Sequence, residues 1–285
     1  MRTRLALCGA VALAACSSPA DMSQTIGVEE TAQTGDGAET ARETLERRVA
    51  ADAEPFEFSE TEGDDRTGMR EFSYKWPRQV SALPALEAEF EADYERQLAT
   101  QKKEWASAQQ DCPGDFVSCR NNYLSLEWQV VADTPRFLSL SSNISTYTGG
   151  AHGNYGRSGS IWDRESGESL QPIQFFTSPA DLDAAVGEEL CERLNAERAK
   201  RRGGPVVSNA DDWASACVPM EDAVLFLGSS DGKAFDRLGV YYGPYVAGAY
   251  AEGDFEFTLP VTDGVMETVK PKFRGAFRKG KAPAP

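Results

Sequence analysis

Histidine is nearly absent from this chain of 285 residues, in which His152 is the only one. A metal site built from several imidazole ligands is therefore excluded, and catalysis by imidazole, which titrates nearest neutral pH, is restricted to one position. Basic residues are also scarce, with 29 lysines and arginines against 45 aspartates and glutamates and a net charge of −16. We expect so acidic a chain to bind no nucleic acid, and we expect neither a metal nor a cofactor.

The hydrophobic run near the amino terminus is short. It covers the eleven residues 5–15 and follows two arginines, and it is too short to span a bilayer core of roughly 30 Å as a helix. Residues 1–15 are typical of a signal peptide. The run ends in Leu-Ala-Ala-Cys, which resembles the bacterial lipobox and predicts that Cys16 is the first mature residue and carries a lipid. The alternative is an ordinary cleavage site with an incidental cysteine.

Ser17, the residue after the predicted lipidation site, indicates which membrane carries the protein. Ser17 stands where many Gram-negative lipoproteins that stay in the inner membrane have an aspartate. We therefore expect a cell-envelope protein, anchored through Cys16 in the outer membrane and facing the periplasm if the source is Gram-negative.

Cysteines are few but even in number after processing. Of six, Cys8 leaves with the signal peptide and Cys16 is acylated, which leaves Cys112, Cys119, Cys191 and Cys217. An even set suits an oxidising envelope, and four cysteines allow three pairings. The local pair, Cys112 with Cys119, is favoured because a short turn-rich loop closes at low entropic cost, and Cys191 is left with Cys217. No Cys-x-x-Cys spacing indicates a metal site.

The chain divides by composition into a tether, a folded part and a tail. Residues 16–69 have few large apolar side chains, which predicts a disordered acidic tether. Residues 17–68 carry 14 acidic and 4 basic residues, so we expect the folded part to be only mildly acidic. Residues 266–285 are expected to form a frayed basic tail.

Hydrophobic periodicity between these limits predicts an α+β fold, an antiparallel sheet with packed helices. Residues 71–76 alternate as in a strand, and an amphipathic helix follows, with Ser81 as its N-cap and Pro84 in its first turn. A second helix starts at Ser178 and ends by Gly203. The remaining strands are expected at residues 124–130, 138–144, 158–162, 223–227, 238–242 and 255–261.

The most distinctive segment joins two expected strands and contains the only histidine. Its glycines Gly149, Gly150 and Gly153 surround His152 and permit a tight, unusual turn. Our interpretation is that His152 hydrogen-bonds backbone groups and fixes this turn. The catalytic alternative makes His152 a general base oriented by a carboxylate such as Asp163, but no nucleophile is marked. The glycines match no phosphate-binding loop.

Two stretches carry a family resemblance. TYTGGAHGNYGRSGSIWDRESGESLQPIQFF, residues 146–176, and more loosely residues 241–260 with Tyr245, resemble bacterial envelope lipoproteins with the paired domains of unknown function DUF4163 and DUF3298 (PdaC-like and RsiV-like). The resemblance implies a DUF4163-like part at 70–177 and a DUF3298-like part at 178–265. We expect the two parts to form one continuous α+β fold. It supplies no catalytic residues, and in some members such domains bind lysozyme. The chain lacks a sigma-binding segment, a transmembrane helix and a polysaccharide deacetylase domain, so an anti-sigma role is not expected.

Three functional hypotheses follow. The first is a lipid-anchored, non-catalytic binding module for a lysozyme-like protein or another envelope protein, with Gly149, Gly150, His152, Gly153 and Tyr245 as possible binding or family-motif residues. The second is a peptidoglycan or carbohydrate binder that uses exposed tyrosines. These tyrosines are Tyr241, Tyr242, Tyr245 and Tyr250. The third, an envelope hydrolase that uses His152, is the least favoured because partner residues are missing.

Overall fold

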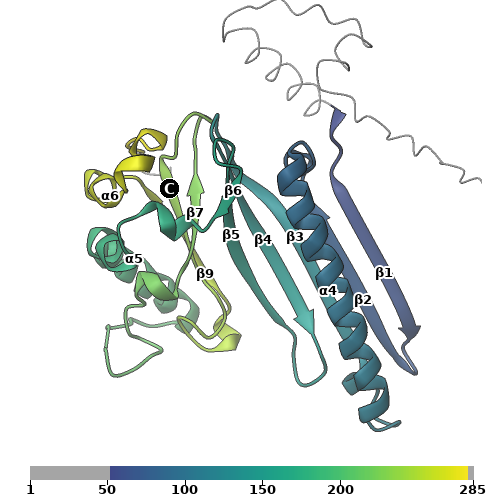
Figure 1. The fold of residues 1–285 in the computed structure, drawn as a ribbon. Coiled ribbons are helices and arrows are strands. Elements are labelled where there is room, and N and C mark those ends of the chain that lie inside the picture. The colour runs from purple at the N-terminus through teal and green to yellow at the C-terminus, as the bar shows by residue number, and fades with distance from the viewer. Residues whose placement is uncertain (1–51, 282–285) are drawn as a thin grey trace, which may run out of the picture. The chain divides into compact units, whose positions relative to one another are not determined.

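The computed structural model describes residues 52–281, which contain two sheets (Figure 1). The predicted signal peptide, Cys16 and the tether up to residue 51 lie outside the described residues. The first sheet has the order β1-β2-β3-β4-β5-β6 and the second has the order β7-β8-β9. The strands of the first sheet are β1 Phe56–Asp64, β2 Gly68–Trp76, β3 Asn122–Asp133, β4 Phe137–Tyr147, β5 Asn154–Asp163 and β6 Glu168–Leu170.

Antiparallel pairing dominates both sheets, as predicted, with one exception. β2 and β3 run parallel, with Phe72 opposite Leu124 and Tyr74 opposite Leu126. The prediction of a purely antiparallel sheet is therefore wrong at this pair. The reason is the long helix α4, Pro84–Asp111, which returns the chain to the starting end of the sheet, so that the next strand enters in the same direction.

The predicted tether boundary at residue 69 is also wrong, because β1 belongs to the sheet. Phe56 and Phe58 alternate with outward-facing residues and pack against the core beneath α4. Glu60 of β1 forms an ion pair with the fully buried Arg70, which also donates a hydrogen bond of 3.1 Å to Gln101 of α4. The acidic residues that made this segment resemble a tether therefore include the partner of a buried cation.

The position of β1 changes the charge of the folded part. Residues 52–281 contain 24 lysines and arginines and 38 aspartates and glutamates, a net charge of −14. The folded part is therefore strongly acidic, and the expectation of a mildly acidic module is wrong.

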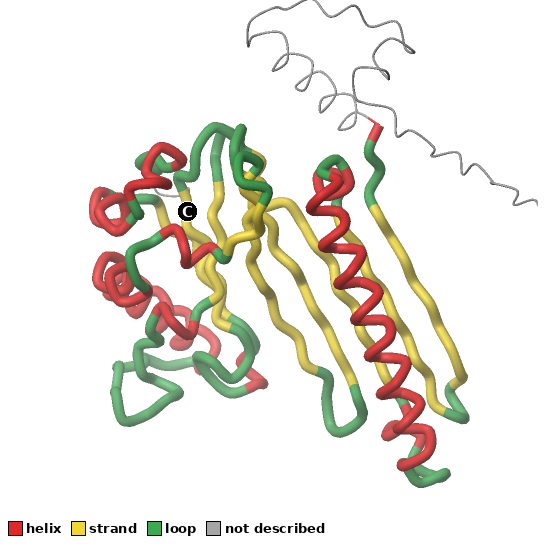
Figure 2. Tube along the Cα trace, in the orientation of Figure 1, coloured by secondary structure: helices red, strands yellow, loops and turns green. Residues whose placement is uncertain are grey.

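Helix α4 covers one face of the first sheet along β1, β2 and β3 (Figures 1 and 2). Beneath it lies an aromatic-rich core formed by Phe72, Tyr74, Trp76, Val80, Leu86, Phe90, Leu126, Leu138, Leu140 and Trp162. Pro84 is the first residue of α4, as predicted, but the predicted N-cap Ser81 instead ends a separate turn of helix, α3 Arg78–Ser81. Ser81 accepts a hydrogen bond of 2.9 Å from the indole of Trp76, which occupies its hydroxyl.

The second sheet packs with two helices around a separate core. Its strands are β7 Val224–Gly228, β8 Arg237–Tyr242 and β9 Phe255–Pro260, and its helices are α5 Pro179–Arg202 and α6 Asp263–Thr268. The predicted start and end of α5 are confirmed, since Ser178 accepts a hydrogen bond from the Asp181 amide and Gly203 has the left-handed φ of 70°. This core also takes Phe137, Ile161 and Phe175 from before residue 178, so it crosses the expected domain boundary.

The carboxyl-terminal residues are packed as far as they are described. The expectation of a frayed tail over 266–285 is wrong up to Lys281, because Val269, Phe273 and Phe277 are buried in the second core. Three apolar side chains spaced four residues apart in this basic segment are enough to hold it. Residues 282–285 lie outside the described residues.

Candidate aromatic binding site

The glycine-rich turn between β4 and β5 has the unusual backbone that its sequence predicts. Gly149 and Gly150 have φ values of 90° and 102°, which residues with a side chain rarely adopt. A Cβ atom on Gly153 would lie 2.8 Å from the carbonyl oxygen of Thr146. The turn therefore requires glycine at these positions, and it presents His152 on the surface.

His152 contacts one backbone group and two tyrosines. Its Nδ1 lies 2.8 Å from the carbonyl oxygen of Gly153, which can only accept, so Nδ1 is the donor. The hydroxyl of Tyr245 lies 3.3 Å from Nε2 and can donate to it. The imidazole also stacks on the ring of Tyr250, with 3.9 Å between ring centroids. The backbone bond agrees with the interpretation that His152 fixes the turn.

Four rings gather here into what we call the aromatic cluster, His152, Tyr155, Tyr245 and Tyr250. The ring centroid of Tyr250 lies 5.4 Å from that of Tyr245 and 6.0 Å from that of Tyr155. The Tyr250 hydroxyl donates a hydrogen bond of 2.7 Å to the Gly153 carbonyl, which joins the loop before β9 to the β4–β5 turn. Tyr155 is 38% exposed and Tyr245 is 55% exposed. Sequence segments almost a hundred residues apart thus form one surface.

Tyr245 has an unusual backbone. Its φ of 68° makes it the only residue other than glycine with a positive φ among residues 52–281. This conformation places a side chain close to its own carbonyl and is disfavoured for all residues except glycine. Such strain persists only where the surroundings hold it, and it is frequent at functional sites.

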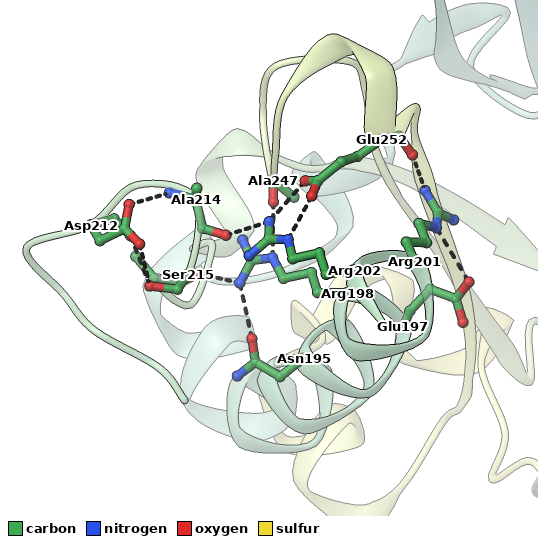
Figure 3. Close-up of polar contacts among 11 residues, drawn as sticks. Asn195, Glu197, Arg198, Arg201, Arg202, Asp212, Ala214, Ser215, Ala247 and Glu252 are labelled. Carbon is green, nitrogen blue, oxygen red and sulfur yellow. Dashed lines mark hydrogen bonds and ion pairs between the residues drawn. The ribbon is translucent and has the colours of Figure 1, made fainter. Parts of the chain in front are cut away.

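Three arginines at the end of α5 contact Ala247 and Glu252 (Figure 3). These two residues belong to the loop that carries Tyr245 and Tyr250. We call Arg198, Arg201 and Arg202 the arginine clamp. Arg198 is fully buried and donates a hydrogen bond of 2.9 Å to the Ala247 carbonyl. Arg201 donates to the carbonyls of Glu252 and Asp254, at 2.5 and 2.7 Å.

The third member of the clamp makes a bidentate ion pair. The guanidinium of Arg202 lies 2.5 and 2.8 Å from the two carboxylate oxygens of Glu252. This pair raises the pKa of Arg202 and, chiefly through the hydrogen bond from Arg202, lowers the pKa of Glu252. Burial, in contrast, lowers the pKa of Arg198. The carboxyl end of a helix favours cations, which suits all three arginines.

A disulfide connects the same helix to a long loop. Cys191 of α5 is bonded to Cys217, and the predicted pair Cys112 with Cys119 also forms, so both predicted pairings are confirmed. The loop before Cys217 offers the carbonyls of Ala214 and Ala216, which accept hydrogen bonds of 2.8 Å from Arg202 and Arg198. The arginine clamp therefore joins the disulfide-bonded loop to the loop of the aromatic cluster.

The structure separates the predicted site residues. His152, Gly153 and Tyr245 come together with Tyr250, but Tyr241 and Tyr242 are 2% and 0% exposed and belong to the protein interior. The expectation that these two tyrosines are exposed is wrong, because both faces of the central strand β8 are covered: Tyr242 lies in the second core, and Arg157 of β5 lies over the ring of Tyr241 on the other face. Burial raises the pKa of Tyr242 to about 12.

The proposed catalytic orientation of His152 by Asp163 is not found. Both carboxylate oxygens of Asp163 accept hydrogen bonds from Arg136, at 2.9 and 2.7 Å. The residues near His152 are tyrosines and a backbone carbonyl instead.

Sequence reasoning missed Tyr155, the arginine clamp and Glu252. Tyr155 stands inside the family-like stretch, two residues after Gly153, but its contact with the ring of Tyr250 depends on tertiary packing. The run Glu-Arg-Ala-Lys-Arg-Arg before Gly203 was available as a signal of cations at a helix end.

Two further properties concern the described part of the chain. Within residues 52–281, no three histidine, cysteine, aspartate or glutamate side chains are grouped so that they could hold a metal ion. None of the helices in this range is both long enough and apolar enough to cross a membrane.

The fold and site together define an α+β protein with an exposed aromatic surface, and comparison with known proteins shows what part of it is similar to. The family model described as "Deacetylase PdaC" matches residues 65–155, which run from β2 to the aromatic cluster. This match agrees with the resemblance of the sequence to PdaC-like proteins. No protein with a curated description matches it.

The solved structures that match this chain include two described as DUF3298 family proteins. One is from Pseudomonas aeruginosa PAO1, with 15% identity and a TM-score of 0.48, and the match covers 82% of this chain and 100% of the other. Another is from Bacteroides fragilis NCTC 9343, with 17% identity and a TM-score of 0.44, and the match covers 79% of this chain and 97% of the other.

Proposed function

We propose that this protein is a lipid-anchored cell-envelope protein whose folded part is a non-catalytic module that binds the glycan of peptidoglycan at the aromatic cluster. The observation that carries the proposal is the exposed cluster itself, in which His152 of the β4–β5 turn and Tyr155 of β5 meet Tyr245 and Tyr250 from the segment between β8 and β9. Tyrosine rings offer an apolar face for the carbon–hydrogen side of a sugar and a hydroxyl for its polar edge.

The fixed positions of these rings favour binding. The bond from Tyr250 to the Gly153 carbonyl and the arginine clamp hold both loops in place before any ligand arrives. A site that is already ordered loses little conformational entropy on binding. The description of the matching family as a deacetylase is in keeping with a ligand that bears acetyl groups.

Retention on purified cell wall tests the proposal. The chain is produced with a Cys16→Ala substitution, so that no lipid attaches, and is sedimented with insoluble peptidoglycan. We expect retention that falls at least about tenfold with Tyr245→Ala. The control is Trp213→Ala, which removes another ring, 55% exposed, outside the cluster. If Tyr245→Ala binds like the parent chain, or if the parent does not bind, the proposed function is wrong.

The anchor is tested separately. The lipobox-like residues before Cys16 support acylation there, and Ser17 supports an outer-membrane location in a Gram-negative cell. We expect the protein to incorporate a fatty-acid label and to sediment with outer membranes, and we expect Cys16→Ala to abolish both. Labelling that persists in Cys16→Ala would contradict the assignment.

A second candidate partner is a cationic protein such as lysozyme. The observation that favours it is the net charge of −14 over residues 52–281, which attracts a basic protein and speeds its association. We expect capture of lysozyme at low salt that weakens steeply at higher ionic strength. No capture at low salt excludes this partner.

A further inference from the structure

The face of the first sheet opposite α4 contains a row of hydroxyl groups that leads to the aromatic cluster. Strand register places Ser59, Ser73, Ser125 and Ser145 opposite one another on β1 to β4. The next partner along the row is Tyr155 of β5, a member of the cluster. Directly paired residues project to the same side of a sheet, so the five side chains form one line.

Neighbouring positions on this face extend the polar surface. Tyr123 and Tyr147 face each other on β3 and β4 in the row beside the serines, and Asn143 lies in the row on the other side. The hydroxyls of Ser59, Ser73, Ser125 and Ser145 make no hydrogen bond with any other described residue, and these four residues are half-buried or exposed. Their donors and acceptors are therefore free for a ligand.

Packing leaves this part of the face uncovered within the described residues. The core beneath α4 takes Phe72, Tyr74 and Leu126, which alternate with Ser73 and Ser125 and so lie on the opposite face. The second sheet covers the far end, where Gly159 would place a Cβ atom 2.4 Å from the Leu225 carbonyl oxygen and where Ile161 is buried. The hydroxyl row lies between these regions.

Charge indicates the kind of partner. The described residues carry a net charge of −14. The serines, Tyr147 and Tyr155 are uncharged, and the charges beside them on this face include the carboxylates Glu71, opposite Tyr123, and Glu127, opposite Asn143. The cations of the adjoining row are already paired, Lys75 with Glu57 and Arg157 with Glu256. An anionic polymer finds no free cation here, whereas an uncharged polymer with many hydroxyl and amide groups matches the surface.

We propose that the hydroxyl row extends the aromatic cluster into a track for an uncharged glycan chain that crosses strands β1 to β5. The track rests on the proposed function and specifies it further. Four steps between neighbouring strands give a length of roughly 19 Å, so the site accommodates several sugar units in line. The end sugar contacts the aromatic cluster, and the following sugars lie over the serines.

The dependence of affinity on glycan length tests the track. The probes are a disaccharide and a hexasaccharide of N-acetylglucosamine, titrated calorimetrically into the Cys16→Ala chain. We expect the hexasaccharide to bind at least about tenfold more tightly. Equal affinities overturn the track but leave the aromatic site intact, whereas absence of binding to either probe overturns both proposals.

A substitution locates the track on the sheet. Ser125→Gln combined with Ser145→Gln places larger uncharged side chains in the row, and the control is Ser107→Gln on the exposed surface of α4. We expect the double variant to bind the hexasaccharide no better than the disaccharide. An unchanged preference for the hexasaccharide in a folded double variant places the glycan elsewhere. Should the double variant not fold, the length dependence of the parent chain still decides.

Discussion

At the scale of single residues, Tyr245 connects backbone strain with the site. Its positive φ of 68° is costly for a side chain, and its ring is half exposed rather than packed in the core. A residue that served only the fold would be replaced by glycine without loss. The conformation instead holds a phenol at the edge of His152, which is what a binding surface requires.

Replacement of Tyr245 by glycine is expected to relieve backbone strain and at the same time to remove binding. Tyr245→Gly relieves the strain, and we expect it to be about 1 kcal/mol more stable than Tyr245→Ala in urea unfolding. Both variants lack the ring, so both should lose retention on cell wall. Equal stabilities would show that the backbone at this position carries no strain.

Glu252 gives the site a pH dependence. The hydrogen bond and charge of Arg202 hold the pKa of Glu252 below its ordinary value of 4.5. The ion pair therefore contributes fully above pH 4.5, and its contribution is lost as the pH falls through the lower pKa of the folded state. We expect Glu252→Gln to lower the free energy of unfolding by about 1 kcal/mol at pH 7. In acid, the free energies of unfolding of the variant and the parent chain should approach each other.

Urea unfolding at a series of pH values measures this difference. Other carboxylates with lowered pKa values, such as Asp163 and Asp236, titrate equally in both proteins and cancel. A stability difference that is constant from pH 7 down to pH 2 would contradict the role of the pair.

At the scale of elements, sequence patterns located those helices and strands that bury one regular face. The sequence predicts the capping serine and the terminal glycine of α5, and also the alternation in β3, because local chemistry determines these features. β1 could not be predicted from the sequence, because the acidic residue Glu60 pairs with Arg70 and Lys102 from elsewhere in the chain. The parallel pairing of β2 and the convergence of Tyr155 with Tyr250 likewise depend on tertiary packing, which periodicity does not encode.

The two disulfides are expected to differ in importance. Cys191 and Cys217 are separated by 26 residues and Cys112 and Cys119 by 7. Loop-closure entropy predicts that removal of the longer bridge costs about 3.5 kcal/mol and that removal of the shorter one costs about 2.4 kcal/mol. Only the longer bridge supports the loop bonded to Arg198 and Arg202, so the Cys191→Ala, Cys217→Ala variant should also lose affinity for cell wall.

Denaturant unfolding and cell-wall retention of the two double variants measure both effects. The variant Cys112→Ala, Cys119→Ala is the matched control. Equal retention by the two variants would separate the disulfide-bonded loop from the site.

At the scale of the whole molecule, two sheets and two cores place the aromatic cluster where they adjoin. β5 of the first sheet supplies Tyr155, the turn before it supplies His152, and the segment between β8 and β9 supplies Tyr245 and Tyr250. The ion pair of Arg157 with Glu256 connects the two sheets beside the cluster. The acidic surface favours a cationic protein as a partner through its charge. The uncharged hydroxyl row favours a neutral glycan through its hydroxyl groups.

The most direct test of glycan binding at the aromatic cluster uses the lone histidine as a reporter. Because His152 is the only one in the chain, an untagged protein shows a single set of imidazole ring signals in a proton–nitrogen or proton–carbon NMR spectrum. We expect these signals to shift progressively as N-acetylglucosamine hexasaccharide is added to the Cys16→Ala chain, and to remain unshifted when Tyr245→Ala and Tyr250→Ala are introduced together. Saturable binding of the hexasaccharide that leaves the His152 signals unmoved would contradict the account.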